Sequence, residues 1–282
     1  TLAEMPERWA HTLTRLLELT PLPDPGFGHL LWQAVIGVWS DDPALRTRLH
    51  AYAEKAMREA GDRTTWTAPD ADYESAVHAA VDAAFDDPRV TAVLGEVLAA
   101  VTTAGWSNAL AAKLVALTVP GVPDVYQGSE LWEQSLVDPD NRRFVDFDTR
   151  AGLLDSLGGG PAASLTDSTD DPGVAKLAVT RAALTLRRDR PELFTSYAPV
   201  AAVGAAADHV LAFDRGGAVT VATRLPVGLA ARDGWGTTTL QLPGGAWRDV
   251  ITGATLTSSA EGLPVSEALG SLPVALLVKE ER

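Results

Sequence analysis

The sequence predicts an α+β fold in which a helical N-terminal part precedes a C-terminal antiparallel β domain. In the first third of the 282 residues, apolar side chains recur at spacings of three and four, as they do along one face of a helix. Beyond Tyr197 apolar and polar residues alternate, which is typical of strands with one buried face. Between these parts, residues 122–126 are a β-prone run with turn residues on both sides, which favours a buried strand after a helix.

Prolines, acidic residues and glycines mark the ends of the predicted helices in this part, because they start or stop helices. The first predicted helix runs from Leu2 to Leu17 and is ended by Pro21, Pro23 and Pro25, and the second runs from Phe27 to Trp39. The third starts at Asp41 or Asp42 before Pro43 and stops at Gly61, and the fourth starts at Asp70 or Asp72.

The middle of the chain predicts more helix on both sides of the 122–126 run. The apolar, alanine-rich segment from Val90 to Val119 indicates a helix with a break at Gly105 and a new N-cap at Ser107. Residues 158–173 contain many glycines, prolines and serines and predict a mobile loop. A helix from Val174 to about Arg188 follows, and its apolar face consists of Leu177, Val179, Ala183 and Leu184.

Alternating runs predict the strands of the C-terminal β domain. The runs cover residues 209–213, 219–223, 238–242 and 272–278. Gly216 and Gly217 provide a hairpin turn between the first two runs. We therefore expect residues 198–282 to form an antiparallel β domain that packs against the helix from Val174 to Arg188.

Composition makes several classes of protein less plausible. The 23 basic and 37 acidic residues give a net charge of −14, which disfavours nucleic acid and anionic membrane surfaces as partners. No apolar run is expected to reach the roughly 20 residues of a membrane helix. There is no cysteine, so disulfides and thiolate metal sites are excluded and a cytoplasmic location is favoured.

Residues 119–148 combine acidic, amide, aromatic and arginine side chains in one strand-to-loop segment. If residues 122–126 are a parallel strand, Gln127 leaves its C-terminal end, where barrels and open α/β folds place their active sites. Carboxylates, amides and guanidinium groups suit sugar hydroxyls, which both donate and accept hydrogen bonds. Aromatic faces such as Tyr126 and Trp132 suit pyranose rings. The segment thus predicts a sugar-binding site.

Within this segment, VPGVPDVYQGSE resembles the last barrel strand of α-amylase-family enzymes, whose pattern is P-G-x-P-x-x-Y-x-G-x-E. The continuation LWEQSLVDPDNRRFVDFD resembles the maltooligosyl trehalose synthases, as do KLAVTRAALTLRRDRPELF at 176–194 and HVLAFDRGG at 209–217. Phe144 departs from the proline expected after the paired arginines, which alters the stiffness of the loop and leaves its polar groups unchanged.

The resemblance covers nearly the whole chain, which would be well under half of such an enzyme. It implies a helical insertion and the helix before the last barrel strand at 1–115. The last βα part of a (β/α)8 barrel with its substrate-side loop would follow at 116–195, and a β-sandwich at 196–282. The parent would be an isomerase that converts the reducing-end α-1,4 bond of a maltooligosaccharide into an α,α-1,1 bond. No cofactor or metal is implied.

The resemblance also implies that the catalytic carboxylates lie upstream of Thr1, in a missing N-terminal barrel portion that would be the partner of this chain. The candidates here are substrate-binding residues: Tyr126, Gln127, Glu130, Asp138, Asp140, Asn141, Arg142 and Arg143.

Each sugar-binding interpretation has a structural alternative. Asp138 and Asp140 could be an acid/base pair, but turn-forming or substrate-binding roles fit two carboxylates so close in sequence better. Arg142, Arg143 and Glu130 could bind sugar or make structural contacts. Asp124 is expected to pair inside the barrel. The histidines lack metal spacing and are interpreted as structural: His11, His29, His50, His78 and His209. Four tryptophans are assigned to the core rather than to glucan stacking: Trp32, Trp39, Trp66 and Trp106.

Two other functions stay open. The chain could act alone as a carbohydrate-binding or accessory module, for which glucan binding without turnover would be the discriminating result. It could also belong to another α-amylase-family hydrolase, because the P-G-x-P segment alone does not separate these activities.

Overall fold

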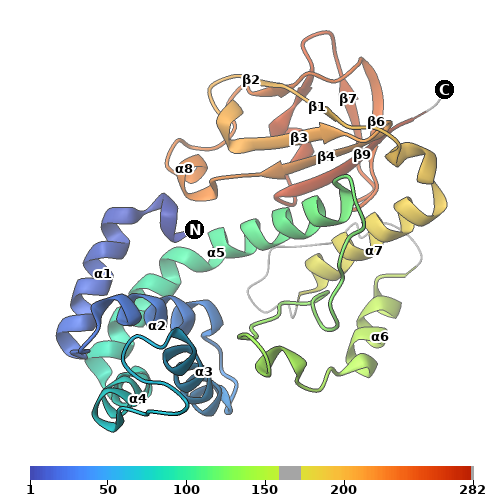
Figure 1. Cartoon of the computed structure of the whole chain (residues 1–282). Coiled ribbons are helices and arrows are strands. Elements are labelled where there is room, and N and C mark those ends of the chain that lie inside the picture. Colours follow the sequence, from blue (N-terminus) through green and yellow to red (C-terminus); the bar gives the residue numbers. More distant parts are fainter. Residues whose placement is uncertain (159–172, 281–282) are drawn as a thin grey trace. The chain divides into compact units, whose positions relative to one another are not determined.

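The computed structural model describes residues 1–158 and 173–280 and combines helices with antiparallel sheets (Figure 1). The loop predicted at 158–173 lies outside the described residues, apart from its two ends. The chain divides into two compact units. The helical unit comprises Leu2–Thr103 and Gln134–Phe144, and the sheet-bearing unit comprises Thr1, Ala104–Glu133 and Val145–Arg282. The domain boundaries expected from the sequence, after residues 115 and 195, stay predictions.

The helical unit contains the helices predicted in the first third of the chain. After a short 3-10 turn at Leu2–Glu4 come α1 (Pro6–Leu19), α2 (Pro25–Val38), α3 (Leu45–Ala60), α4 (Ala71–Asp86) and the first part of α5 (Pro88–Thr118). Local side chains fix the ends. Asp24 accepts hydrogen bonds from Gly26 and Phe27 amides, and Asp70 accepts one from the Tyr73 amide. Gly61 ends α3 in the left-handed region at φ 72°.

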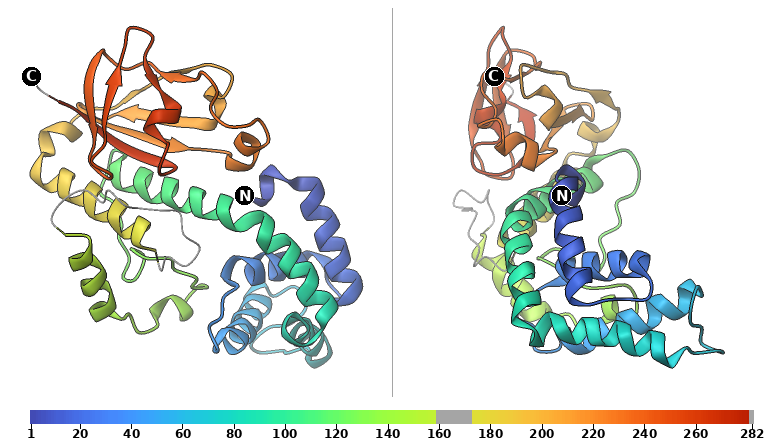
Figure 2. Two further views of the ribbon diagram at one scale, coloured as in Figure 1. Left: turned by 180° about the vertical axis from the view of Figure 1, so that it is seen from behind. Right: turned by 90° about the vertical axis from the view of Figure 1, so that its left-hand side faces the viewer.

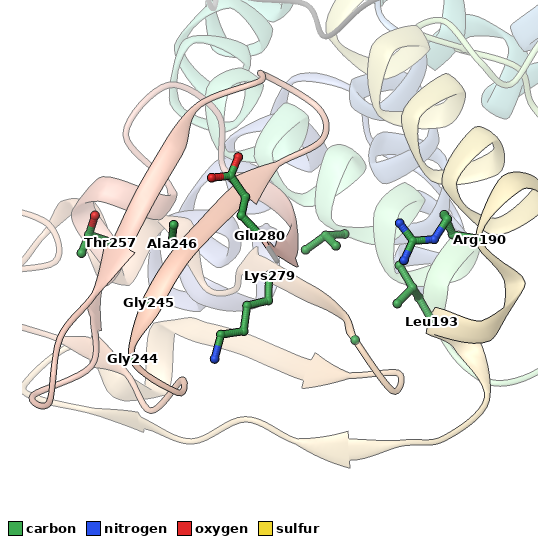
Figure 3. Close-up of a pocket in the computed structure, with 10 residues that line it drawn as sticks. Arg190, Leu193, Gly244, Gly245, Ala246, Thr257, Lys279 and Glu280 are labelled. Carbon is green, nitrogen blue, oxygen red and sulfur yellow. The ribbon is translucent and has the colours of Figure 1, made fainter. Parts of the chain in front are cut away.

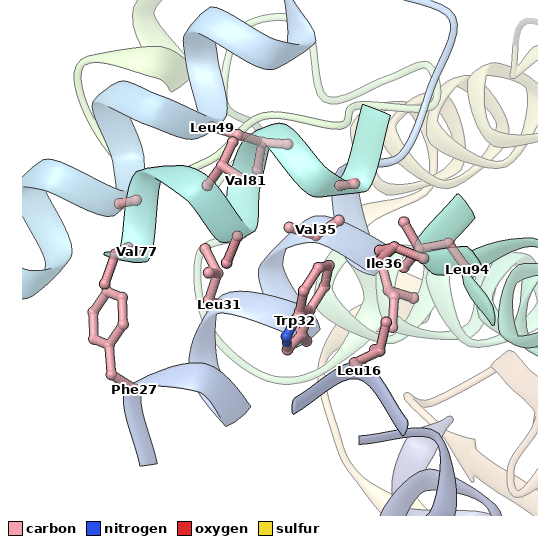
Figure 4. Packing of buried hydrophobic residues seen from close by; sticks show 14 of the residues in the cluster. Leu16, Phe27, Leu31, Trp32, Val35, Ile36, Leu49, Val77, Val81 and Leu94 are labelled. Carbon is pink, nitrogen blue, oxygen red and sulfur yellow. The ribbon is translucent and has the colours of Figure 1, made fainter. Parts of the chain in front are cut away.

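The core of the helical unit is assembled from one face of each helix (Figure 4). Leu31 and Trp32 of α2 are fully buried against Leu16 of α1, Leu49 of α3 and Val81 of α4. The interpretation of Trp32 as a core residue is confirmed. This closely packed core gives the loop at residues 134–144 a rigid surface to pack on.

Helix α5 corrects two expectations. It is one uninterrupted helix of 31 residues, so the predicted break at Gly105 and the N-cap at Ser107 are wrong. A glycine inside a helix costs only about 1 kcal/mol, which neighbouring helical hydrogen bonds and packing outweigh. By length and composition alone α5 could also cross a membrane, although no such apolar run was expected. One helix of this kind is weak support for a membrane protein, because core helices of soluble proteins have the same properties.

The sheet-bearing unit has two antiparallel sheets, as two further views show (Figure 2). One has six strands in the order β1-β3-β4-β9-β6-β7, and the other has three in the order β2-β5-β8. The strands are β1 (Ala198–Pro199), β2 (Ala202–Val203), β3 (Val210–Asp214), β4 (Ala218–Thr223), β5 (Thr239–Leu240), β6 (Gly245–Asp249), β7 (Thr255–Ser258), β8 (Leu263–Pro264) and β9 (Val274–Lys279). The short helices α8 (Pro226–Ala230) and α9 (Val265–Ala268) lie between strands, and η3 (Pro191–Phe194) and η4 (Ala207–His209) are 3-10 turns.

Alternate residues of β4 and β9 pack in two different hydrophobic clusters. Ala222 of β4 and Leu276 of β9 pack with Val179 and Ala183 of α7 (Val174–Asp189), as predicted. Val221 of β4 packs in a second cluster, which also contains residues of the three-stranded sheet. The antiparallel sheets and their contact with α7 are thus confirmed, although Leu184, assigned to the apolar face of α7, is exposed.

The predicted hairpin joins β3 to β4 and also ties the sheet to helix α5. Asp214 accepts hydrogen bonds from the amides of Gly216 and Gly217, whose positive φ angles suit glycine. Arg215 is buried and donates to the carbonyls of Ser196, Phe194 and Thr118. The Thr118 carbonyl is at the C-terminal end of α5, where carbonyls have no helical partner. Arg215 therefore caps this helix from the hairpin.

The prediction of a strand at residues 122–126 is wrong for this chain. These residues are irregular, and Val122 is 98% exposed. A single strand is not stable without neighbours that pair with its amide and carbonyl groups, and none of the strands in the described part of the chain pairs with it. The next regular elements are the 3-10 turn η2 (Asp140–Arg142) and helix α6 (Phe147–Ser156).

Candidate functional site

The eight candidate substrate-binding residues are divided between the two units. Tyr126, Gln127 and Glu130 belong to the sheet-bearing unit, and the other five lie on the loop at 134–144 of the helical unit. Convergence of all eight on one polar surface stays a prediction. Each group nevertheless has well-defined contacts within its own unit.

In the sheet-bearing unit, Glu130 is part of a network that holds residues 128–133 in place. Arg150 Nε lies 2.5 Å from Glu130 Oε1, and Arg150 also donates to the Gly128 carbonyl at 3.1 Å. Lys113 of α5 donates to the Ser129 hydroxyl at 3.1 Å, and Lys176 of α7 donates to the Leu131 carbonyl at 2.9 Å. Glu130 therefore has a structural partner on its own unit.

Lys176 is an unusual member of this network because burial and the nearby Lys113 lower its pKa to about 8. Its ammonium group lies 5.8 Å from the centre of the Trp132 ring, and Trp132 stacks on Trp106 at 5.6 Å. Trp132, considered for pyranose stacking, thus packs against the hydrophobic cluster that contains residues of α5 and α7. Trp106 contacts it there, in agreement with a structural role.

Tyr126 and Gln127 come before this network and are exposed, with 45% of Tyr126 accessible. Asp124, expected to pair inside a barrel, is also exposed. An exposed tyrosine ring and an exposed amide next to the ordered 128–133 segment are free to contact a ligand.

In the helical unit, Arg48 of α3 is the centre of the candidate loop. Its side chain is 8% exposed and makes two hydrogen bonds to the Asp140 carboxylate, at 2.8 and 2.9 Å. It also binds the Asp42 carboxylate at 2.8 Å and the Gln134 carbonyl at 2.6 Å. The Leu136 amide donates to Asp140 at 2.7 Å. Asp140 is therefore a structural anchor that fixes the loop to α3.

The electrostatics of this anchor follow from its geometry. Burial would raise the pKa of Asp140, but hydrogen bonds from Arg48 and the Leu136 amide, together with the Arg48 and Arg143 charges, lower it overall. Arg143 lies 3.3 Å from the Asp140 carboxylate and 3.6 Å from that of Asp42. Asp140 stays ionised at neutral pH, so it is unsuited to donate a proton as a general acid.

The remaining loop residues are more accessible. Lys55 of α3 donates to the Asp138 carbonyl at 2.5 Å and lies 3.4 Å from its carboxylate, and Arg142 lies 3.2 Å from the same carboxylate. The Oδ1 atom of Asn141 is buried and has no hydrogen-bond partner among the described residues.

A groove of 590 Å³ in the helical unit lies next to this loop. It is lined by α3 residues, by Trp66 from the α3–α4 connection and by the loop residues Val137, Asp138, Pro139, Asp140 and Arg143. Trp66 is 58% exposed, so its assignment to the core is wrong. The error arose because helical spacing was assumed, whereas Trp66 lies between helices, among Thr65, Thr67 and Pro69. That flanking composition was the available signal for a loop position.

A second cavity, of 1110 Å³, lies in the sheet-bearing unit and contains none of the candidate residues (Figure 3). Gly244 and Gly245 form one side, and the side chains of Arg190, Leu193 and Lys279 extend along others. Its lining has no aromatic side chain that could stack on a sugar ring.

Residues 1–158 and 173–280 contain no group of three His, Cys, Asp or Glu side chains arranged to hold a metal ion.

Known proteins match this chain along almost its entire length, although no family model matches it. Two proteins from Mycobacterium tuberculosis strains carry the name maltooligosyl trehalose synthase and are 46% identical over 286 residues, which is 99% of this chain and 35% of each of them. The solved maltooligosyltrehalose synthase from Arthrobacter ramosus is 48% identical, with a TM-score of 0.89 over 99% of this chain and 36% of that one. The DSM5389 glycosyltrehalose synthase, at 24% identity and a TM-score of 0.77, shares the fold.

The fold and these matches define the chain as similar to one part of a larger sugar-converting enzyme. The matched enzymes are maltooligosyl trehalose synthases, so the resemblance stated from the sequence motifs is confirmed. The chain spans about a third of the length of these relatives.

Proposed function

We propose that this chain is the C-terminal part of a maltooligosyl trehalose synthase, an enzyme that converts the reducing-end α-1,4 bond of a maltooligosaccharide into an α,α-1,1 bond. The observation that carries the proposal is 48% identity with a TM-score of 0.89 over 99% of the chain. At this identity the side chains of a site are often retained along with the fold. A cytoplasmic location, suggested by the absence of cysteine, is part of the proposal.

In the proposed enzyme, catalytic carboxylates from the portion outside this chain form and resolve a covalent glucosyl intermediate with retention of configuration. The released glucose attacks that intermediate in place of water, which requires a site that holds glucose and excludes solvent. The proposed contribution of this chain is the wall of that site. Tyr126 and Gln127 suit this role because both side chains are exposed.

Residues 122–126 are proposed to become the last strand of a (β/α)8 barrel when the remaining two thirds of the enzyme supply neighbouring strands. Their backbone pairs with none of the described strands, which supports this assignment because a barrel strand requires partners on both sides. The two C-terminal sheets, which share a hydrophobic core, are proposed to form a β-sandwich.

A chimera tests the proposed function. The matching 36% of the Arthrobacter ramosus synthase is replaced with this chain, and the purified chimera is incubated with maltopentaose. The expected result is loss of reducing ends and formation of a non-reducing product. A folded chimera that instead releases glucose and increases the number of reducing ends would indicate a hydrolase. The parental synthase is the positive control, and circular dichroism establishes that the chimera is folded.

A further inference from the structure

We infer that the groove beside Trp66 in the helical unit binds a neutral α-1,4-linked glucan chain. The sugar class follows from the groove itself, whereas the α-1,4 linkage rests on the proposed function. Three lining residues, Asp138, Asp140 and Arg143, were candidates from the sequence, whereas Trp66 had been assigned to the core and Tyr52 had not been considered.

Trp66 provides a platform for a sugar ring. Its indole is 58% exposed, yet Arg58 holds it in place, with the guanidinium carbon 4.9 Å from the ring centre. Arg58 is in turn fixed by Glu74 at 2.7 Å. An exposed aromatic ring with a supported orientation loses little entropy when a pyranose stacks on it, because the ring is already ordered.

The groove also has both apolar and polar parts. Val137, Pro139 and Tyr52 give it apolar surface. Burial raises the pKa of the Tyr52 phenol, which therefore stays neutral and can both donate and accept a hydrogen bond. Its volume of 590 Å³ lies within the range of about 300–1,000 Å³ that is typical of ligand pockets.

The charges in the groove favour a neutral ligand. Its lining contains three cationic side chains, Arg48, Lys55 and Arg143, and four carboxylates, Glu54, Glu59, Asp138 and Asp140. Most of them are already paired, as in the Arg48–Asp140 and Lys55–Asp138 contacts. An anion would meet an excess of carboxylates, and a cation would have to compete with existing ion pairs.

Several of these paired groups are nevertheless about half exposed. Half of the Asp138 side chain, 57% of that of Glu59 and 44% of that of Arg143 are accessible. Half-exposed carboxylates and a guanidinium group in the same groove as an aromatic ring suit hydroxyl groups, which donate and accept. A protein segment is a poorer occupant, because the centres of protein interfaces are depleted of charged residues.

Titration of the 282-residue chain with maltoheptaose by isothermal calorimetry tests this inference. We expect the wild-type chain to bind maltoheptaose, and Trp66→Ala to weaken binding by about tenfold or more, the effect of removing a central aromatic anchor. Trp66→Phe should retain most of the affinity. Tyr197→Ala is the matched control, because Tyr197 is 55% exposed, does not line the groove and belongs to the other unit.

The outcomes separate this inference from the proposed function. Equal affinity of the wild type and Trp66→Ala would overturn the groove assignment, while the proposed function would survive, since glucan would then bind elsewhere on the chain. No binding at millimolar maltoheptaose would also overturn the groove assignment, and the chimera would still test the proposed function independently. Equal binding of cellohexaose would overturn the α-1,4 preference. A thermal melt of Trp66→Ala that matches the wild type excludes misfolding as the cause of lost binding.

Discussion

Single residues in the loop at 134–144 differ in the contacts that they make within the helical unit. Asp140 is held by Arg48 and by the Leu136 amide, so its carboxylate is fully used within the helical unit. Asn141, one residue later, has a buried carbonyl oxygen without a partner in the described part of the chain. Sequence alone placed both in the same class, because it shows which groups are polar and not which of them are already paired.

Replacement of Arg48 tests the anchoring role. Arg48→Ala should lower the free energy of unfolding of the helical unit by about 3–5 kcal/mol, because it leaves the Asp140 carboxylate poorly solvated and without its buried cation, with only the more exposed Arg143 nearby. Urea denaturation followed by tryptophan fluorescence measures the loss. Arg143→Ala, which removes a more exposed partner of the same carboxylate, should cost less than about 1 kcal/mol. Equal losses for the two variants would contradict the anchoring role of Arg48.

Lys176 predicts a dependence of stability on pH. Its pKa in the folded chain is about 8, whereas an unfolded lysine has a pKa of about 10.4. Between these values the unfolded chain binds the additional proton, so the Lys176 contribution to stability rises with pH over this window. Urea denaturation at pH 8 and pH 10 should show a smaller increase, or a larger decrease, for Lys176→Met than for the wild type. The same pH dependence in both proteins would contradict this prediction.

At the scale of elements, the features that could be predicted were those set by neighbouring residues. Helices α2, α3 and α4 have local caps at Asp24, Gly61 and Asp70, which can be recognised in sequence. Strand β6 was not predicted, because it follows Pro243 and Gly244 and begins at Gly245, and this cluster of turn residues obscures it. Trp66 was assigned to the wrong environment because a helical period was applied to a residue in a loop.

Helix α5 allows a direct test of why the predicted break is absent. A methyl group added at Gly105 would have no neighbour within 4 Å, so packing does not require glycine there. Gly105→Ala should raise the free energy of unfolding by about 0.5–1 kcal/mol, because alanine favours the helix and restricts the unfolded chain. In contrast, Gly28→Ala should destabilise α2, since the new methyl group would lie 2.7 Å from Leu17 Cδ2. Destabilisation by Gly105→Ala in a urea titration would argue that the helix needs flexibility at this position.

At the scale of the whole molecule, the main difference between sequence and structure concerns residues 122–126. Their pattern predicts a buried strand, and the motif around them resembles the last strand of a barrel, yet Val122 is 98% exposed and the segment is irregular. A strand depends on pairing with segments distant in sequence, so a local pattern can indicate a strand that the chain alone cannot complete. This agrees with a chain that spans about a third of its relatives.

We have proposed that this chain supplies part of the substrate site of a maltooligosyl trehalose synthase and that the catalytic carboxylates lie outside it. The most direct measurement is incubation of the purified 282-residue chain with maltopentaose, following reducing ends and non-reducing product over time. Our account predicts that the reducing ends stay constant, because two carboxylates on either side of one glycosidic bond are required for the reaction. Turnover on the order of 1 to 1,000 per second, as in ordinary enzymes, would contradict it.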